Sequence, residues 1–68
     1  LLANLGLVHH QAGRLIEAIG HYEQALAVAE ELGDRQDASV ALNNLGRVYR
    51  ERGETESAIE LFDQALVV

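Results

Sequence analysis

The chain has 68 residues, a formal net charge of −6, and neither cysteine nor proline. This length allows one small domain at most, and the lack of cysteine excludes disulfides and thiolate metal sites. The acidic balance argues against nucleic acid as a partner, because phosphate binding needs a clustered excess of basic side chains. No apolar run reaches the roughly 20 residues that span a bilayer, so we expect no membrane association and a soluble, cytoplasmic protein.

Apolar residues spaced three and four apart predict a first helix from the start of the chain to about Ala12, ended by Gly13. A second helix is predicted over about Leu15 to Leu32. The inner face of the first helix is expected to hold Leu2, Leu5, Val8, His9 and Ala12, and that of the second Ala18, Tyr22, Ala25 and Ala29, widened by Ile19 and Leu26.

The pair Gly33-Asp34 predicts a turn, in which the glycine ends one helix and the aspartate caps the next. The third helix is expected over about Arg35 to Arg52 and to be ended by Gly53. The fourth is expected to begin near Thr55, with that threonine as its cap, and to run to the last residue.

Shifting the chain by forty residues superposes it on an earlier copy of itself, with twelve of 28 overlapping positions identical. The sequence therefore predicts an all-α fold of two stacked antiparallel helical hairpins, a fragment of an α-solenoid. We expect one module over 1–68, with repeat one at 1–33, repeat two at 34–68, and both truncated relative to the period. Identical pairs include Leu5 and Leu45, Gly6 and Gly46, Val8 and Val48, Ile19 and Ile59, and Leu26 and Leu66.

The pattern of small, aromatic and leucine residues in each hairpin resembles the tetratricopeptide repeat family. The second copy carries Leu45-Gly46, Tyr49, Ala58, Phe62 and Ala65, and the first carries Leu5-Gly6, Ala18, Tyr22 and Ala25. His9 replaces the family tyrosine, and the forty-residue period exceeds the usual repeat of about 34 residues. The chain is thus similar to a long-period subgroup found in LGN/Pins-type scaffolds, kinesin light chains and bacterial regulator arrays.

The resemblance implies a concave groove, lined by the first helix of each hairpin, that receives a protein or peptide segment. The carboxamides of Asn4 and Asn44 would pair with the peptide backbone, and Arg47 and Arg50, one turn apart, would bind a carboxylate. Alternatively, Asn44 bonds to a neighbouring helix and the arginines only complement the negative end of their own helix. The implied groove residues are Ala3, Asn4, Leu7, His10, Gln11, Asn43, Asn44, Arg47, Arg50 and Glu51.

Catalysis and metal binding have little support in these residues. His9, His10 and His21 include no pair at the i, i+4 spacing that would place two ligands on one helix face. No glycine-rich phosphate loop precedes a helix, and the hydroxyl residues lack a recognisable base. We therefore predict a protein that is not an enzyme and that uses no cofactor or metal.

The leading hypothesis is a scaffold module that binds a peptide or protein in the groove. The alternative is a structural or self-associating segment, in which the apolar ends Leu1-Leu2 and Leu66-Val67-Val68 dock onto further repeats or other copies. A third possibility is a repeat array that regulates an enzyme elsewhere on a longer chain.

Overall fold

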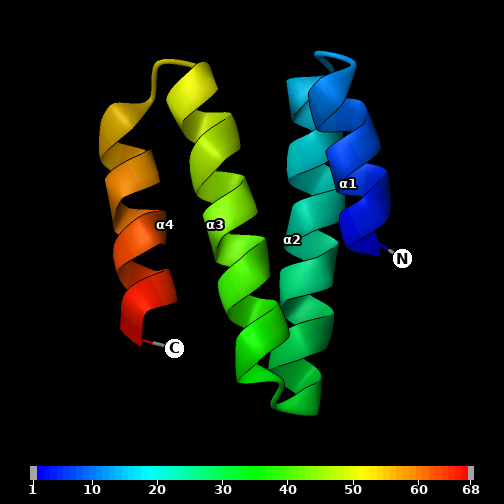
Figure 1. Cartoon of the computed structure of the whole chain (residues 1–68), viewed down its shortest axis with the longest axis vertical. Helices are drawn as coiled ribbons and strands as arrows, with labels where there is room; N and C mark the ends of the chain where they lie inside the picture. Colours follow the sequence, from blue (N-terminus) through cyan, green and yellow to red (C-terminus); the bar gives the residue numbers. More distant parts are fainter. Residues whose placement is uncertain (1, 68) are drawn as a thin grey trace.

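A computed structural model describes the backbone of residues 2–67 and the side chains of residues 5–67. It contains four helices, which Figure 1 shows arranged as two antiparallel hairpins. This all-α architecture confirms the predicted fold class, and the helix boundaries agree with the predicted ones to within one residue wherever the chain is described. The helices are α1 (Leu2–Gln11), α2 (Leu15–Leu32), α3 (Arg35–Glu51) and α4 (Thr55–Val67).

The helices pack in chain order: α1 on α2, α2 on α3, and α3 on α4. The result is a flat molecule, with Cα extents of 30 × 26 × 12 Å. In Figure 1, α1 and α4 lie at opposite edges, with the N-terminus beside one and the C-terminus beside the other. Among the described helices, none has the length and apolar content of a membrane-spanning segment.

Left-handed glycines end the helices at the turns. Gly33 has φ +68°, and Gly53, the repeat equivalent of Gly13, has φ +82°. At the first of these turns, the Asp34 amide donates to the Ala29 carbonyl at 2.9 Å. This geometry, which glycine adopts without a Cβ penalty, satisfies helix-end carbonyls and reverses the chain within two residues.

The two helix starts that were expected to carry side-chain caps behave differently. The Asp34 carboxylate accepts a hydrogen bond from the Asp37 amide at 3.0 Å, which confirms the predicted cap of α3. Thr55 is not a cap, because it is itself the first residue of α4. The turn before α4 is instead held by the Glu54 amide, which donates to the Tyr49 carbonyl at 2.9 Å.

The core lies where the two hairpins meet. Ala18 and Tyr22 from α2 pack with Leu45 and Val48 from α3, and all four are buried. The small alanine lets the helices approach while the ring and the branched side chains fill the space between them. This confirms the predicted apolar stripe of α2. The partly buried residues around this core are Leu15, Ile19, Leu26, Tyr49 and Leu61.

Within each hairpin, an aromatic ring packs directly against a glycine of the facing helix. A Cβ built on Gly6 would lie 2.5 Å from the Tyr22 ring, and one on Gly46 would lie 2.7 Å from the Phe62 ring. Such distances leave no room for any side chain at either position. The glycine of the Leu-Gly pair in each repeat is therefore a packing requirement.

The predicted inner face of α1 is wrong for most of its described members. Leu5, Val8 and Ala12 are exposed, and only His9 is partly buried; Leu2 lies outside the residues whose side chains are described. The physical reason is visible in the second repeat. There the equivalents of Leu5 and Val8 are buried because they pack with Ala18 and Tyr22 of the preceding helix, α2, and no described helix precedes α1 in this way.

Replacing Gly46 by alanine is expected to destabilise the fold. The new methyl must displace the Phe62 ring, and overpacking of this kind costs about 1–3 kcal/mol, which outweighs the gain in helix propensity of up to about 1 kcal/mol. Urea or thermal unfolding followed by circular dichroism measures the change. Gly20→Ala is the matched control, because no atom lies within 4 Å of its Cβ position and the propensity gain should stabilise the chain. Equal stabilisation by both substitutions would contradict the packing role.

Candidate peptide-binding surface

The groove residues predicted on α3 share the face of that helix that points away from the core. At 3.6 residues per turn, the five positions span about a third of the helix circumference. The opposite side of α3 carries the buried residues of the core. Asn43, Arg47, Arg50 and Glu51 are exposed, and Asn44 is partly buried.

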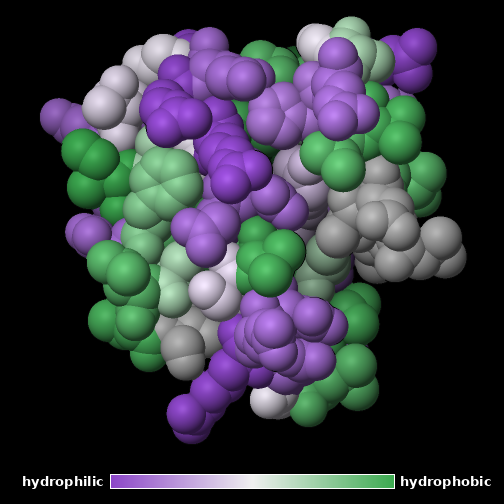
Figure 2. Space-filling model, viewed as in Figure 1, coloured by the Kyte–Doolittle hydropathy of each residue, from purple (hydrophilic) through white to green (hydrophobic). Residues whose placement is uncertain are grey.

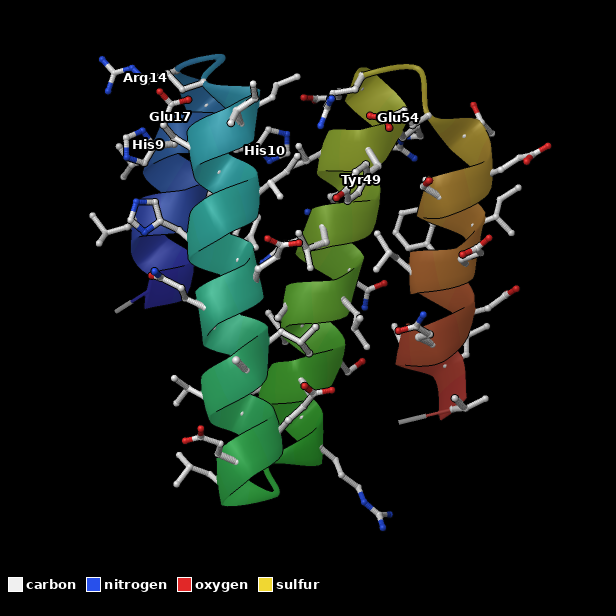
Figure 3. The ribbon with its side chains drawn as sticks, turned by 180° about the vertical axis from the view of Figure 1, so that it is seen from behind. His9, His10, Arg14, Glu17, Tyr49 and Glu54 are labelled. Atoms are coloured by element: carbon white, nitrogen blue, oxygen red, sulfur yellow. The ribbon has the colours of Figure 1, made fainter. Side chains whose placement is uncertain are left out.

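On α1 the described members of the predicted set are Leu7, His10 and Gln11. Leu7 and Gln11 are exposed, whereas His10 is partly buried. Figure 3 shows that His10 points toward α3 and that His9 lies on the other side of the hairpin. Ala3 and Asn4 lie outside the residues whose side chains are described. We call the eight described residues on α1 and α3 the groove face: Leu7, His10, Gln11, Asn43, Asn44, Arg47, Arg50 and Glu51.

A hydrogen bond joins the two helices of the groove face. His10 Nε2 lies 2.8 Å from Glu51 Oε2, so the structure brings together two predicted site residues that are 41 positions apart in the chain. The pair is an ion pair when His10 is protonated. Because the Glu51 side chain is half exposed, the pair contributes at most about 1 kcal/mol. The bond links α1 to α3, while the packing of α1 is on α2.

The amides and two arginines of the groove face make few contacts within the chain. In the part of the chain that the structure describes, no side-chain hydrogen bond involves Asn43 or Asn44, and no ion pair involves Arg47 or Arg50. The Asn44 side chain therefore makes no bond there to a neighbouring helix. These donors and acceptors are free to meet a ligand or water.

Arg52 fits the helix-end role proposed for the arginines. Its Nε lies 3.0 Å from Glu54 Oε2, and its guanidinium lies 5.8 Å from the centre of the Tyr49 ring. A cation at this end also complements the helix dipole. Figure 3 shows Tyr49 and Glu54 near the turn between α3 and α4.

Tyr22 places a polar atom beneath the groove face that the sequence analysis did not single out. The residue is fully buried, and its hydroxyl has no hydrogen-bond partner among the described residues. Burial raises the pKa of the Tyr22 phenol, and the nearby positive charge of Arg47 offsets part of that rise. The sequence does distinguish this position, because the first repeat carries the hydroxyl of Tyr22 where the second repeat carries Phe62.

His9 and His21 stack within the first hairpin. Their ring centroids are 5.1 Å apart and their planes differ by 3°. His9 therefore packs where the family tyrosine is expected. Parallel stacked rings do not direct their nitrogen lone pairs toward a common point, and in the described residues no group of three or more His, Cys, Asp and Glu side chains could hold a metal ion.

A shallow depression of about 410 Å³ lies at the turn between α2 and α3. None of its lining residues belongs to the groove face. The lining residues are Ala29, Glu30, Gly33, Asp34, Arg35, Ala38 and Leu42.

Two stacked antiparallel hairpins with glycine–aromatic contacts and an equivalent pattern forty residues apart define an α-helical repeat protein. The sequence pattern of the tetratricopeptide repeat family matches residues 1–66. The chain belongs to this family. Its members are typically scaffolds that bind other proteins, without enzymatic activity of their own.

Several known proteins resemble the chain. It is 38% identical over 61 residues to the photosystem I assembly protein Ycf3 of Synechococcus sp. (strain CC9605), across 90% of the chain and 34% of that protein. It is 34% identical over 64 residues to the uncharacterized protein ycf37 of Pyropia yezoensis, across 94% of the chain and 33% of that protein. It is 35% identical over 54 residues to outer dynein arm-docking complex subunit 4 of Danio rerio, across 79% of the chain and 11% of that protein.

The chain thus spans about a third or less of each of these relatives. No solved structure shows a significant match.

The buried phenol predicts a loss of stability at alkaline pH. Below the ordinary tyrosine pKa of about 10, Tyr22 is neutral in both folded and unfolded chains. Above it the unfolded chain ionises first, because the folded pKa is raised, and stability falls by up to about 1.4 kcal/mol per pH unit. Tyr22→Phe should remove this part of the pH dependence and keep or raise stability at pH 7, since it deletes a buried hydroxyl. Urea unfolding between pH 7 and 11 measures it.

The matched control is Tyr49→Phe, which leaves Tyr22 in place and should keep the alkaline loss due to Tyr22. An unchanged alkaline profile in Tyr22→Phe would show that the Tyr22 phenol does not cause it.

Proposed function

We propose that the chain is a scaffold module that binds an extended acidic peptide, or the acidic segment of a protein, on its groove face. The observation that carries this proposal is the set of amide and guanidinium groups on α3 that have no side-chain partner among the described residues, beside the α1 helix to which α3 is joined by the His10–Glu51 bond. Binding residues carried on rigid helices are positioned more accurately than residues on loops, which favours recognition by preformed groups.

The charges of the groove face favour an acidic ligand. Arg47 and Arg50 are exposed and one turn apart, so both guanidinium groups can reach carboxylates of one ligand. The Glu51 carboxylate is hydrogen-bonded to His10, and a protonated His10 would offset its negative charge. The chain as a whole is acidic, with a net charge of −6, so surfaces outside the groove face repel an acidic peptide. Figure 2 shows hydrophilic side chains gathered in the upper centre and again in the lower centre of the molecule, with apolar side chains between them and toward the edges.

The amides of Asn43 and Asn44 suit an extended main chain. A carboxamide donates and accepts hydrogen bonds, so it pairs with a peptide group whatever the side chain of that residue. Leu7 adds an exposed apolar contact on α1. In this proposal the arginines select acidic ligands and the amides contribute affinity that is independent of sequence.

The family and its named relatives are compatible with a protein ligand. One relative is named for photosystem I assembly and another for dynein arm docking, both of which concern assemblies of proteins. The forty-residue period supports a place in the long-period subgroup that the sequence resembles. A cytoplasmic location is part of the same proposal.

A panel of fluorescent peptides tests the function. Ten-residue peptides rich in Asp and Glu, and matched peptides with Asn and Gln, are titrated with the chain and followed by fluorescence anisotropy. We expect binding to the acidic set that weakens with added salt. Arg47→Ala should weaken binding about tenfold, and Asn44→Ala by about threefold to tenfold, because charged hydrogen bonds are worth roughly twice neutral ones. Both variants should keep the helical circular dichroism spectrum.

The matched controls are Arg35→Ala and Gln64→Ala, which remove an exposed guanidinium and an exposed amide away from the groove face. Equal losses of peptide affinity in the Arg47 and Arg35 variants would show that binding depends on net charge and not on the groove face. Full affinity in both groove variants, or no binding to any acidic peptide, would overturn the proposal.

A further inference from the structure

Two residues on α1 are exposed at positions whose copies on α3 are buried. Leu45 and Val48 on α3 are 2% and 0% exposed, in contact with α2. Their equivalents forty residues earlier, Leu5 and Val8, have the same side chains but are 41% and 58% exposed. We call Leu5 and Val8 the outer face of α1. It is a second copy of the surface that α3 presents to α2.

The same relation holds at the other edge of the molecule. Ile19 and Leu26 on α2 pack against the core that α2 forms with α3. Their equivalents on α4, Ile59 and Leu66, are 53% and 84% exposed. We call Ile59 and Leu66 the outer face of α4. It copies the surface that α2 presents to α3.

The chain therefore contains the two halves of one interface twice, buried once at the α2–α3 junction and exposed once at its edges. Figure 1 shows α1 and α4 at opposite edges, so the two exposed halves of a single chain cannot meet each other. We propose that the outer face of α4 docks onto the outer face of α1 of a second copy of the chain, in the arrangement by which α2 packs on α3.

The charges of the two helices favour this head-to-tail contact. By helical spacing, Glu60 and Asp63 flank the outer face of α4, whereas α1 contains no acidic residue. Two α4 helices packed against each other would oppose like charges, which is costly at an interface. An α4 helix packed on α1 avoids this repulsion.

The His10–Glu51 pair, which joins the two repeats within the chain, would have a counterpart without opposed like charges at the contact between copies. His10 bonds to Glu51 within the chain. Forty residues along, the equivalent of His10 is Arg50, and the equivalent of Glu51 is Gln11 of the next copy. A guanidinium can donate to an amide oxygen, so the same register leaves no like charges opposed at this position.

A contact between two different faces does not close on itself as a two-fold dimer does. Each docked copy presents a new free outer face, so association continues with concentration. The groove face shares only Gln11 and Arg50 with this contact between copies. Asn44 and Arg47 lie outside it, so their alanine variants report on peptide binding, whereas the outer-face variants below report on association.

The test uses one variant for each outer face of the 68-residue chain. Val8→Glu places a charge on the outer face of α1, and Leu66→Glu places one on the outer face of α4. Sedimentation equilibrium over about three decades of concentration, up to about 1 mM, gives the mass of each variant. We expect the wild-type mass to rise past that of a dimer, and each variant alone to associate at least about tenfold more weakly. An equimolar mixture should form a one-to-one dimer and nothing larger, through the two intact faces.

Leu32→Glu is the matched control, because Leu32 is an exposed apolar residue that belongs to neither outer face, and it should assemble as the wild type does. Circular dichroism checks that each variant keeps its helices. Leu5→Glu and Ile59→Glu form a second pair for the same mixing experiment, used if either first variant loses helix. A wild-type monomer at every concentration, undiminished association of either variant alone, or a mixture that stays monomeric would each overturn the proposal.

Discussion

The close approach of a glycine to an aromatic ring in each hairpin is the contact on which the rest of the structure depends. At Gly6 and Gly46, the facing ring lies where a Cβ would be. This contact sets the spacing of the two helices in each hairpin. The ring of Tyr22 also belongs to the core shared with α3, so the same side chain that pairs α1 with α2 joins the first hairpin to the second. Phe62 has no following hairpin among the described residues and is only partly buried.

This packing also determines what the solvent face of α3 can do. The core holds one side of α3, which leaves the opposite side as a fixed row of amide and guanidinium groups. The buried leucine and valine side chains set the rotation of this helix, so the backbone positions that carry these groups are fixed relative to the core. The His10–Glu51 bond extends this fixed surface to α1.

Most of the fold could be predicted from the sequence, because its determinants are local. The helix period, the left-handed glycines and the Asp34 cap act over a few residues. The orientation of α1 could not be predicted in the same way. Periodicity shows that Leu5 and Val8 share a face but does not show which helix covers that face, and the structure shows that their α3 counterparts face the preceding hairpin.

In the candidate site, too, some properties follow from local sequence and others only from tertiary structure. Its residues could be assigned to one face of α3 by spacing alone, but two of its properties arise only in three dimensions. The bond between His10 and Glu51 connects residues in different helices, and the burial of the Tyr22 hydroxyl depends on three helices meeting. No pattern within one helix encodes either property.

The chain-order packing of the helices has a consequence for how the molecule folds. The extensive contacts all join consecutive helices, so each requires the closure of only a short turn and costs little chain entropy. Proteins dominated by such local contacts fold in microseconds to milliseconds. Either hairpin can form first and serve as a template for the other, and α1 or α4 can detach at its edge while the α2–α3 junction stays intact.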